Sequence, residues 1–381
     1  MRRRHRWPAL VGLVALLVVL VGCSSSGASL LRPAAGVRAE VHHTAPCAAP
    51  DGQNPTFWRV EGNHLLDTRR QVMIPYGVTL YDLARPDWQQ ASAGQEQLMK
   101  GAITEWCTNF IRLQLAPAHL LDQVPYDGAY VREIEAQVAY AASWNQNVIL
   151  SAQTELDHAR GGGANPTAQT LRFWKTLAPL FKTDPRVWFD IFNEPRLNAG
   201  AATWQVWQQG GTVGGQTYVG MQQVVDAIRL AGAPNLIFAE GPDAGETLAG
   251  LPGHQLTGLN IAYAVHSYSA HTPAQWDMRF GNASATVPVL DDEWSQSAAA
   301  KNCSASAGTW VPEFLLYLRH HQIGLGVWGF QPGVLLTSTQ TFTPTTIPDD
   351  YDCQPAGARI AARNTMGAGQ LVEQYFRSYS H

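Results

Sequence analysis

Eight short apolar segments recur between residues 72 and 328, and longer stretches separate each from the next. Several of these stretches repeat apolar residues at the helical period, for example 129–144, 168–180 and 216–231. Strands that alternate with helices pair in parallel, because a parallel neighbour is reached only through a crossover of about a dozen residues. The eight expected strands are 72–79, 109–115, 147–153, 187–193, 235–240, 261–268, 287–293 and 323–328.

The number of strand–helix units distinguishes between two α/β architectures. Eight units match a single (β/α)8 TIM barrel better than an open doubly wound sheet. The chain has 381 residues, of which 45% are hydrophobic, so it can bury a core of that size. A small hairpin is expected before the barrel, with strands at 57–60 and 64–66 around a turn at 61–63.

The amino terminus has the pattern of an export signal. Four arginines precede an apolar stretch at 10–21, which is too short to span a bilayer comfortably. The stretch ends in Leu20-Val21-Gly22-Cys23, which resembles the lipobox of bacterial lipoproteins, so Cys23 is expected to carry lipid. An ordinary secretory signal is the alternative. The expected organisation is a signal peptide at 1–22, a tether at 23–55 and the barrel domain at 56–381.

Four further cysteines fall in a chain that we expect to be exported, and an even number there indicates two disulfides with three possible pairings. Cys303 and Cys353 follow the seventh and eighth strands, so both are expected in loops at one end of the barrel. Cys47 and Cys107 precede the hairpin and the second strand, at the opposite end. We therefore expect the pairs Cys47–Cys107 and Cys303–Cys353. The four cysteines lack metal-ligand spacing, so no zinc site is expected.

The charge of the chain argues against one class of partner. The net charge is −4, and four of the 26 basic residues lie within the first six positions, so the rest of the chain is more acidic still. Binding to nucleic acid needs clustered lysines and arginines. No nucleic-acid partner is therefore expected.

Polar side chains stand at the ends of most of the expected strands. In a (β/α)8 barrel, catalytic groups come from the carboxyl ends of several strands. Two of these positions carry Glu194 and Glu293, and paired carboxylates are typical of glycosidases. One carboxylic acid protonates the leaving oxygen, while a carboxylate attacks or stabilises the anomeric carbon. The other strand-end residues are Arg112, Gln153, Asn193, Glu240, His266, Tyr268 and Trp328.

The segment 189–195, Phe-Asp-Ile-Phe-Asn-Glu-Pro, resembles the fourth-strand signature of glycoside hydrolase family 5, the cellulase-like retaining β-glycanases. Other motifs follow in that family's order. They are Arg112 in the second strand, His266-Ser267-Tyr268 in the sixth, 288–293 in the seventh, Trp276-Asp277 with Phe280-Gly281 in the helix between these two, and Trp328 in the eighth. The resemblance covers about residues 58–375 and implies that 56–381 is a glycoside hydrolase catalytic domain.

The resemblance also implies a role for each matched residue. Glu194 is expected to be the general acid/base, with a pKa raised by burial beside the second carboxylate. Glu293 is expected to be the nucleophile that forms the glycosyl-enzyme intermediate. Arg112 is expected to keep Glu293 ionised, and Tyr268 to donate a hydrogen bond to it.

The remaining matched residues are expected to contact the sugar. Asn193 is expected to donate to the 2-OH, and Trp328 to stack on the apolar face of a pyranose. His266 lies two residues before Tyr268 on the same side of the strand, and reaches Glu194 or the sugar. The expected substrate-binding set is Arg112, Gln153, Asn193, His266, Tyr268 and Trp328.

Two positions leave alternatives open. Asp291 shares a strand face with Glu293, and Asp292 is adjacent, so three acids compete for the nucleophile's role. At the third strand, Gln153 stands where the family usually has a histidine. Glutamine can hydrogen-bond to a sugar but cannot titrate, so Gln153 indicates an outlying subfamily with a different glycone pocket.

The expected function is therefore retaining hydrolysis of β-linked glycans, with an endo-β-1,4-glucanase first in rank. A β-mannanase or an enzyme of envelope glycans is the alternative within this class, and an inactive sugar-binding lipoprotein is the alternative outside it. No metal or cofactor is expected to take part. The expected protein is a monomer whose partner is a polysaccharide or oligosaccharide. It is held outside the cytoplasmic membrane by a lipid anchor only, or secreted.

Overall fold

The computed structural model describes residue 47 and residues 58–122, 128–154, 162–198, 200–268, 272–296, 307–345 and 368–379. The contacts divide the chain into 1–45 and 46–381, and every described residue belongs to the second part. The predictions for Cys23, the signal peptide, Cys303 and Cys353 lie outside these residues.

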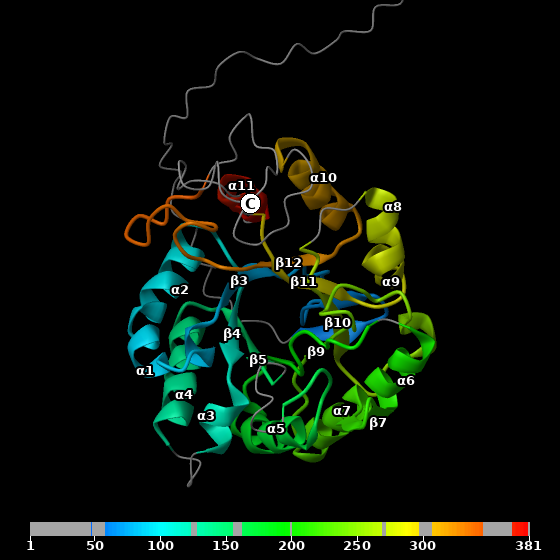
Figure 1. Ribbon diagram of the computed structural model, residues 1–381. Coiled ribbons are helices and arrows are strands. Elements are labelled where there is room, and N and C mark those ends of the chain that lie inside the picture. The colour runs from blue at the N-terminus through cyan, green and yellow to red at the C-terminus, as the bar shows by residue number, and fades with distance from the viewer. Residues whose placement is uncertain are drawn as a thin grey trace, which may run out of the picture. The chain divides into compact units, whose positions relative to one another are not determined.

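Eight parallel strands close into a barrel with helices around it, which confirms the predicted (β/α)8 fold (Figure 1). Neighbouring strands follow the order β10-β11-β12-β3-β4-β5-β6-β9, so the chain winds once around the barrel. The strands are β3 (Tyr76–Leu80), β4 (Phe110–Leu115), β5 (Asn147–Ala152), β6 (Val187–Asp190), β9 (Ile237–Glu240), β10 (Ile261–Val265), β11 (Val289–Trp294) and β12 (Gly324–Val327). Each lies within one residue of, or inside, a predicted apolar segment.

The helices cover the outer face of the barrel with their apolar sides. In α5, for example, Phe173, Trp174 and Leu177 are fully buried, and Thr167 caps the first turn by accepting from the Gln169 amide. The predicted helices 129–144 and 168–180 are confirmed. The helices are α1 (Trp88–Ala91), α2 (Gln95–Thr104), α3 (Pro117–Leu121), α4 (Ala129–Ser143), α5 (Ala168–Phe181), α6 (Ala201–Gln209), α7 (Met221–Leu230), α8 (Pro273–Trp276), α9 (Asn282–Ser284), α10 (Ala307–His320) and α11 (Gly369–Arg377).

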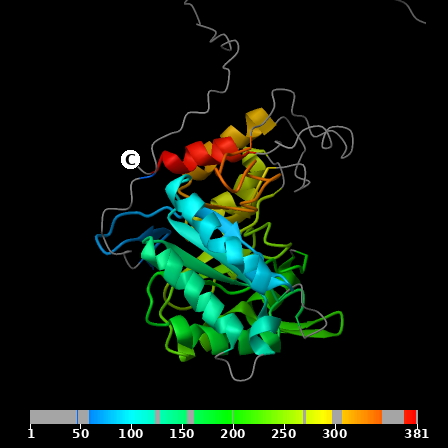
Figure 2. The same ribbon diagram turned by 90° about the vertical axis from the view of Figure 1, so that its left-hand side faces the viewer.

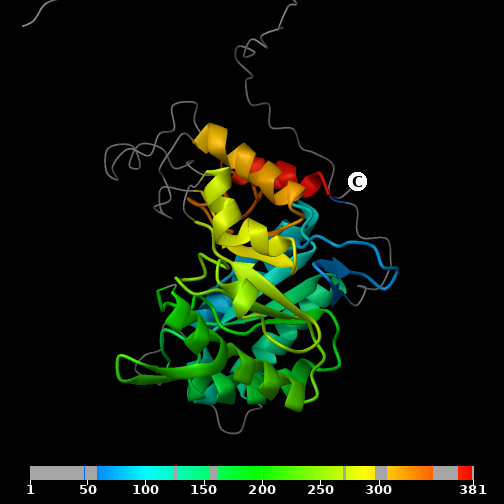
Figure 3. The ribbon, with the colours of Figure 1, turned by 90° about the vertical axis from the view of Figure 1, so that its right-hand side faces the viewer.

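The predicted helix 216–231 is wrong over its first turn. Residues Gln216–Val219 form strand β8, which pairs antiparallel with β7 (Gly210–Val213), and α7 begins only at Met221. The helix is interrupted here by the two-residue turn Gly214-Gly215, whose φ angles of 58° and 82° suit glycine. This turn joins β7 and β8 in a tight hairpin. This hairpin projects beyond the helices in Figures 2 and 3 (green).

Side chains alternate between the two faces of each strand, so the apolar side chains form two separate cores. Strand residues of one parity, such as Ile111 and Leu113, pack with the helices, whereas Phe110, Ile149 and Trp188 meet inside the barrel. The predicted hairpin β1 (Arg59–Glu61) with β2 (His64–Leu66) is confirmed. Trp58, just before it, joins the inner core, with its ring centroid 4.9 Å from that of Trp188. Inward positions beyond this apolar layer are polar, which places a polar site at the carboxyl ends of the strands.

Cys47 and Cys107 form a disulfide with their Cα atoms 5.2 Å apart, as predicted. The Cys47 amide also donates to the carbonyl oxygen of Thr104 at 2.9 Å, near the end of α2. The last part of the predicted tether is therefore fastened to the barrel at Cys47. Among the described residues, none of the helices is both long and apolar enough to cross a membrane.

Candidate active site

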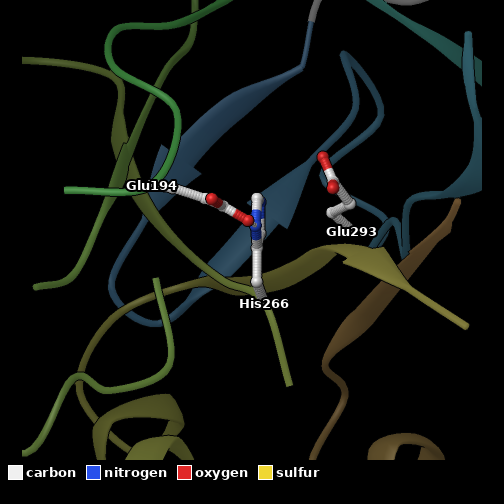
Figure 4. Close-up of side chains that lie close together, drawn as sticks. All are labelled: Glu194, His266 and Glu293. Atoms are coloured by element: carbon white, nitrogen blue, oxygen red, sulfur yellow. Dashed lines mark hydrogen bonds and ion pairs between the residues drawn. The ribbon is translucent and has the colours of Figure 1, made fainter. Parts of the chain in front are cut away.

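Three titratable side chains meet at the carboxyl end of the barrel. Glu194 follows β6, His266 follows β10, and Glu293 lies within β11. Figure 4 shows Glu194 and Glu293 on either side of His266. One carboxylate oxygen of Glu194, one of Glu293 and a ring nitrogen of His266 all lie within 4.8 Å of one another. Carboxyl groups of retaining glycosidases are about 5–5.5 Å apart and those of inverting enzymes about 6.5–9.5 Å, so this spacing is of the retaining kind.

Three donors hold Glu293. The Arg112 guanidinium and the Gln114 amide each donate to Oε2 at 2.7 Å, and the Tyr268 hydroxyl donates to Oε1 at 2.9 Å. Glu293 keeps only 7% of its surface exposed, so it has one open side. The donors fix both oxygens and stabilise the negative charge that a nucleophile needs.

A β-bulge in β11 separates the three competing acids. Asp291 pairs with Leu325 and Trp294 with Val327, so β11 has one residue more than β12 between these pairs. The extra residue turns both Asp292 and Glu293 toward Arg112, whereas Asp291 points to Ser267. The prediction that Asp291 shares a face with Glu293 is therefore wrong, because strict alternation fails at a bulge.

Neither aspartate is placed as Glu293 is. Burial raises the pKa of Asp291 to about 8, although its hydrogen bond to Ser267 opposes the shift, and Asp291 is fully buried. Asp292 is also fully buried, with one oxygen 3.2 Å from Arg112 Nε and the other 3.3 Å from His266 Nε2. Glu293 is thus the only one of the three acids with surface exposed to a sugar.

Glu194 has a backbone conformation that non-glycine residues seldom adopt, with φ at 48°. Its Oε2 accepts from Arg196 at 2.7 Å, and its Oε1 lies 3.4 Å from Nδ1 of His266. Burial alone raises the pKa of Glu194, but the hydrogen bonds and charges of His266 and Arg196 outweigh it and lower the pKa. The expected raised pKa is therefore not present in this state, because two cations and not the second carboxylate dominate.

His266 is fully buried among acids. Its Nε2 lies 3.2 Å from Glu240 Oε1 and 3.3 Å from Asp292 Oδ1. Burial opposes protonation of the imidazole, but the surrounding carboxylates, Glu240 foremost, raise its pKa well above the ordinary value. The surrounding carboxylates therefore favour the imidazolium form of His266, and its Nδ1 lies 3.4 Å from Glu194 Oε1.

Arg112 lies at the centre of the barrel with its side chain fully buried. Besides Glu293, its guanidinium lies 2.8 Å from Asp190, 3.2 Å from Glu240 and 3.2 Å from Asp292. Arg112 and His266 are fully buried and contact the carboxylates in this structure, so their expected contact with the sugar stays a prediction. The expected contacts Arg112–Glu293, Tyr268–Glu293 and His266–Glu194 are present.

The other expected substrate contacts line the same end of the barrel. Asn193 accepts from Arg112 through Oδ1 at 2.8 Å, which fixes the orientation of its amide group. Gln153 follows β5 and donates to Ser151 at 3.3 Å. Trp328 follows β12 and is half-buried, with its ring centroid 6.5 Å from that of Tyr81.

Several residues of the site were missed by the sequence interpretation. Gln114 lies two positions after Arg112 on the same inward face, so strand alternation alone could have identified it. Asp190 stands inside the quoted signature, but its contact with Arg112 depends on the closed barrel. Arg196 lies only two positions after Glu194, and its guanidinium donates to Glu194 Oε2 at 2.7 Å. Glu240 is among the expected strand-end residues, and the sequence predicts no catalytic role for it.

Within the part of the chain that the structure describes, two groups of three residues have the spacing of metal ligands, and both include His266. They are Glu194-His266-Glu293 and Glu240-His266-Asp292. Arg112 or Arg196 already pairs with each of these carboxylates, and the carboxylates favour the cationic form of His266. The short distances within both groups are therefore explained by ion pairs between protein side chains.

Residues 72–333 match the family model described as Cellulase (glycosyl hydrolase family 5). The chain belongs to glycosyl hydrolase family 5. The matched range contains both glutamates and every expected substrate-binding residue. The order of the family 5 motifs therefore agrees with the geometry of the site.

Curated relatives are distant. Endoglucanase N of Pectobacterium atrosepticum is 24% identical over 258 residues, which cover 67% of this chain and 52% of that protein. Endoglucanase 5 of Pectobacterium carotovorum is 25% identical over 258 residues, which cover 67% of this chain and 46% of that protein. The family 5 chain thus spans about half the length of the curated relatives it matches.

Solved structures share the fold. A beta-glucanase of Saccharophagus degradans in complex with cellotetraose superposes with a TM-score of 0.65 at 18% identity. The match covers 86% of this chain and 94% of that one. At this identity the similarity shows a common barrel and leaves the substrate of this family 5 member to be argued from its site.

Proposed function

We propose that this family 5 protein is a retaining endo-β-1,4-glucanase that acts through Glu194 and Glu293. The observation that carries the proposal is the pair of carboxylates within 4.8 Å, one paired with cations and partly open, the other held by three donors. Retaining hydrolysis needs this asymmetry, because one group exchanges protons while the other attacks carbon.

In the first step, an oxygen of Glu293 attacks the anomeric carbon and forms the glycosyl-enzyme bond. The bond from that carbon to the leaving oxygen breaks, and Glu194 gives its proton to that oxygen. Because His266 and Arg196 lower the pKa of Glu194, the protonated form of Glu194 is favoured at acidic pH. We therefore expect activity on unactivated glycosides to be greatest on the acid side of neutrality.

In the second step, the ionised Glu194 takes a proton from water as the water oxygen attacks the anomeric carbon. The bond to Glu293 breaks, and Glu293 returns to the carboxylate held by Arg112, Gln114 and Tyr268. The cations that lower the pKa of Glu194 assist this step, because they keep the base ionised.

The substrate class rests on the relatives. Two curated relatives are named as endoglucanases, and one similar structure holds cellotetraose. Asn193 and Gln153 supply polar groups beside the pair of carboxylates, and the half-buried Trp328 supplies an aromatic face for a pyranose. A merely sugar-binding protein has no need of two carboxylates at catalytic spacing, so hydrolysis is the better account.

The test is a panel of dinitrophenyl β-glycosides of cellobiose, mannobiose and other disaccharides, each with its 2-deoxy-2-fluoro analogue. We expect a covalent adduct on Glu293 with the cellobiose analogue, found by intact mass and peptide mapping, and none in Glu293→Gln. An adduct on Asp291 or Asp292 refutes the assignment of the nucleophile. Preference for the mannoside makes the protein a β-mannanase, and sugar binding without turnover or adduct makes it a binding protein.

We also propose that the protein is exported and anchored by lipid on Cys23. The Cys47–Cys107 disulfide supports export, since such bonds persist in oxidising compartments. Labelling of bacterial cells that express the chain with a radioactive fatty acid tests the anchor. We expect label on the wild type and none on Cys23→Ser, and an unlabelled wild type in the membrane-free fraction indicates an ordinary secreted protein.

A further inference from the structure

Glu240 is a fully buried acid at the end of β9 that neither chemical step uses. Its two oxygens have different partners. Oε2 accepts from the backbone amide of Glu194 at 2.7 Å. Oε1 lies 3.2 Å from His266 Nε2 and 3.2 Å from a terminal nitrogen of Arg112. One carboxylate thus contacts the backbone of the acid/base and the two cations that face the catalytic pair.

The hydrogen bond from the Glu194 amide to Glu240 involves a residue with an unusual backbone conformation. The φ angle of Glu194 is 48°, in the left-handed region that non-glycine residues adopt when their surroundings hold them there. The amide that donates to Glu240 belongs to this same residue, so the bond acts directly on the strained torsion. Loss of the bond frees the Glu194 backbone to relax and displaces its carboxylate.

The side-chain contact acts through the imidazole. The two nitrogens of His266 face opposite partners, with Nε2 near Glu240 and Nδ1 3.4 Å from Glu194 Oε1. A carboxylate on one ring nitrogen sets the orientation and protonation of a histidine, and hence what the other nitrogen does. Glu240 therefore influences both the backbone and the carboxylate of Glu194.

The surroundings leave Glu240 little freedom to move. A Cβ atom on Gly245, whose φ is 78°, would lie only 3.0 Å from Glu240 Oε2. Beside Gly245, the Ala244 amide donates to the Pro195 carbonyl oxygen at 2.8 Å. This hydrogen bond joins the loop after β9 to the loop after β6. The Trp207 indole donates to the Glu240 carbonyl oxygen at 2.8 Å. A carboxylate packed this closely transmits its position to its partners.

We propose that Glu240 is a positioning residue for the general acid/base, which it aligns through the amide of Glu194 and through His266. The proposal rests on the proposed function of Glu194. The simpler account is that Glu240 only balances the charge of Arg112. Arg112 also holds Glu293, so that account predicts equal damage to reactions that need the acid and reactions that do not.

The experiment compares two substrates that differ in their need for an acid. Cellotetraose has a sugar alkoxide as its leaving group, which must be protonated, whereas 2,4-dinitrophenyl cellobioside releases 2,4-dinitrophenolate, which departs without protonation. The full chain is measured as wild type, Glu240→Gln and Glu240→Asp. The first variant removes the charge, and the second keeps the charge but withdraws it from the Glu194 amide. Glu373→Gln is the matched control, because Glu373 lies in helix α11 and pairs with Arg377.

We expect kcat/KM for cellotetraose to fall about 100-fold in both Glu240 variants, since general acid catalysis contributes about 10²–10⁴-fold. We expect kcat/KM for the dinitrophenyl glycoside to stay within about threefold, and the fluoro analogue to label Glu293 at a similar rate. In the Glu194→Ala variant, adding Glu240→Gln is expected to lower kcat/KM for cellotetraose little further. The control keeps both activities.

Equal losses on the two substrates overturn the proposal, as does loss of labelling or of fold in both variants, because Glu240 then acts on more than the acid/base. Unchanged turnover of cellotetraose overturns it too. If the wild type hydrolyses neither substrate, the proposed function is wrong. Hydrogen exchange of the Glu194 backbone amide then tests by itself whether Glu240 holds that amide. Exchange about tenfold faster in Glu240→Asp supports the contact, and unchanged exchange refutes it.

Discussion

Replacing Arg112 by methionine removes the guanidinium at the centre of the barrel and leaves a shorter, unbranched and apolar side chain. Four carboxylates then lose their ion pair with arginine, at distances of 2.7–3.2 Å in the intact protein. Three of them, those of Asp190, Glu240 and Asp292, have no exposed surface. Water therefore cannot take the place of the lost cation.

The expected loss follows from this burial. Removing one partner of a buried ion pair costs about 3–5 kcal/mol, because the remaining charge is left without compensation. A typical domain is stable by about 5–15 kcal/mol, so the variant should still fold at neutral pH but with much reduced stability. An exposed pair gives the comparison. Arg279 and Glu246 keep about a third of their surface in water, and breaking that pair should cost about 0.2–1 kcal/mol.

The loss should also depend on pH. Burial already raises the pKa of Asp190 and of Glu240 in the presence of Arg112. Without the cation, the folded-state pKa values rise further above the unfolded value of about 4. A carboxyl group with a raised folded-state pKa binds its proton more tightly when folded, so stability falls as pH rises through that window. The penalty of Arg112→Met should thus be smaller near pH 4.5 than near pH 7.

Urea unfolding followed by tryptophan fluorescence measures these differences. The wild type, Arg112→Met and the control Arg279→Met are compared at about pH 4.5 and about pH 7. A penalty below about 1 kcal/mol for Arg112→Met at neutral pH refutes the reasoning. A penalty equal at the two pH values also refutes it, because buried carboxylates then carry no uncompensated charge.

Three further outcomes are expected. Arg196→Gln removes a cation that lowers the pKa of Glu194, so the alkaline limb of kcat/KM on cellotetraose should move to higher pH; an unmoved limb contradicts the pairing. Tyr268→Phe removes one of three donors to Glu293 and should lower the rate of covalent labelling by the fluoro glycoside about tenfold, with little change in the thermal midpoint. Cys47→Ala breaks the disulfide and should lower the free energy of unfolding by about 2–5 kcal/mol without changing kcat; an unchanged urea midpoint argues against the bond.

The pKa of Glu194 shows how the site divides its two tasks. Arg196 and His266 keep this group ionised in the free protein, which suits the base of the second step. The first step needs the protonated form of Glu194, which the positive charges of His266 and Arg196 disfavour. The pH profile of the first step, read from an unactivated glycoside, therefore reports directly on these two cations.

The sequence by itself determined the barrel and the order of its parts. The spacing of apolar residues and the alternation of strand-like and helix-like segments are local properties of the sequence. The eight strands, and the helices 129–144 and 168–180, follow from them. The positions of Glu194 and Glu293 at strand ends follow as well, because every parallel strand of a closed barrel ends at the same face.

Tertiary structure alone decided how the acids are used. The bulge in β11 depends on the pairing of Asp291 and Trp294 with β12, and it turns Glu293 to the inner face, whereas strict alternation would leave it on the same face as Asp291. The pKa of Glu194 depends on His266, 72 residues further along, and the backbone of Glu194 depends on Glu240. These effects arise from charges brought together in a buried space, where a shift of a few ångströms changes the energy greatly. Local sequence carries no record of those distances.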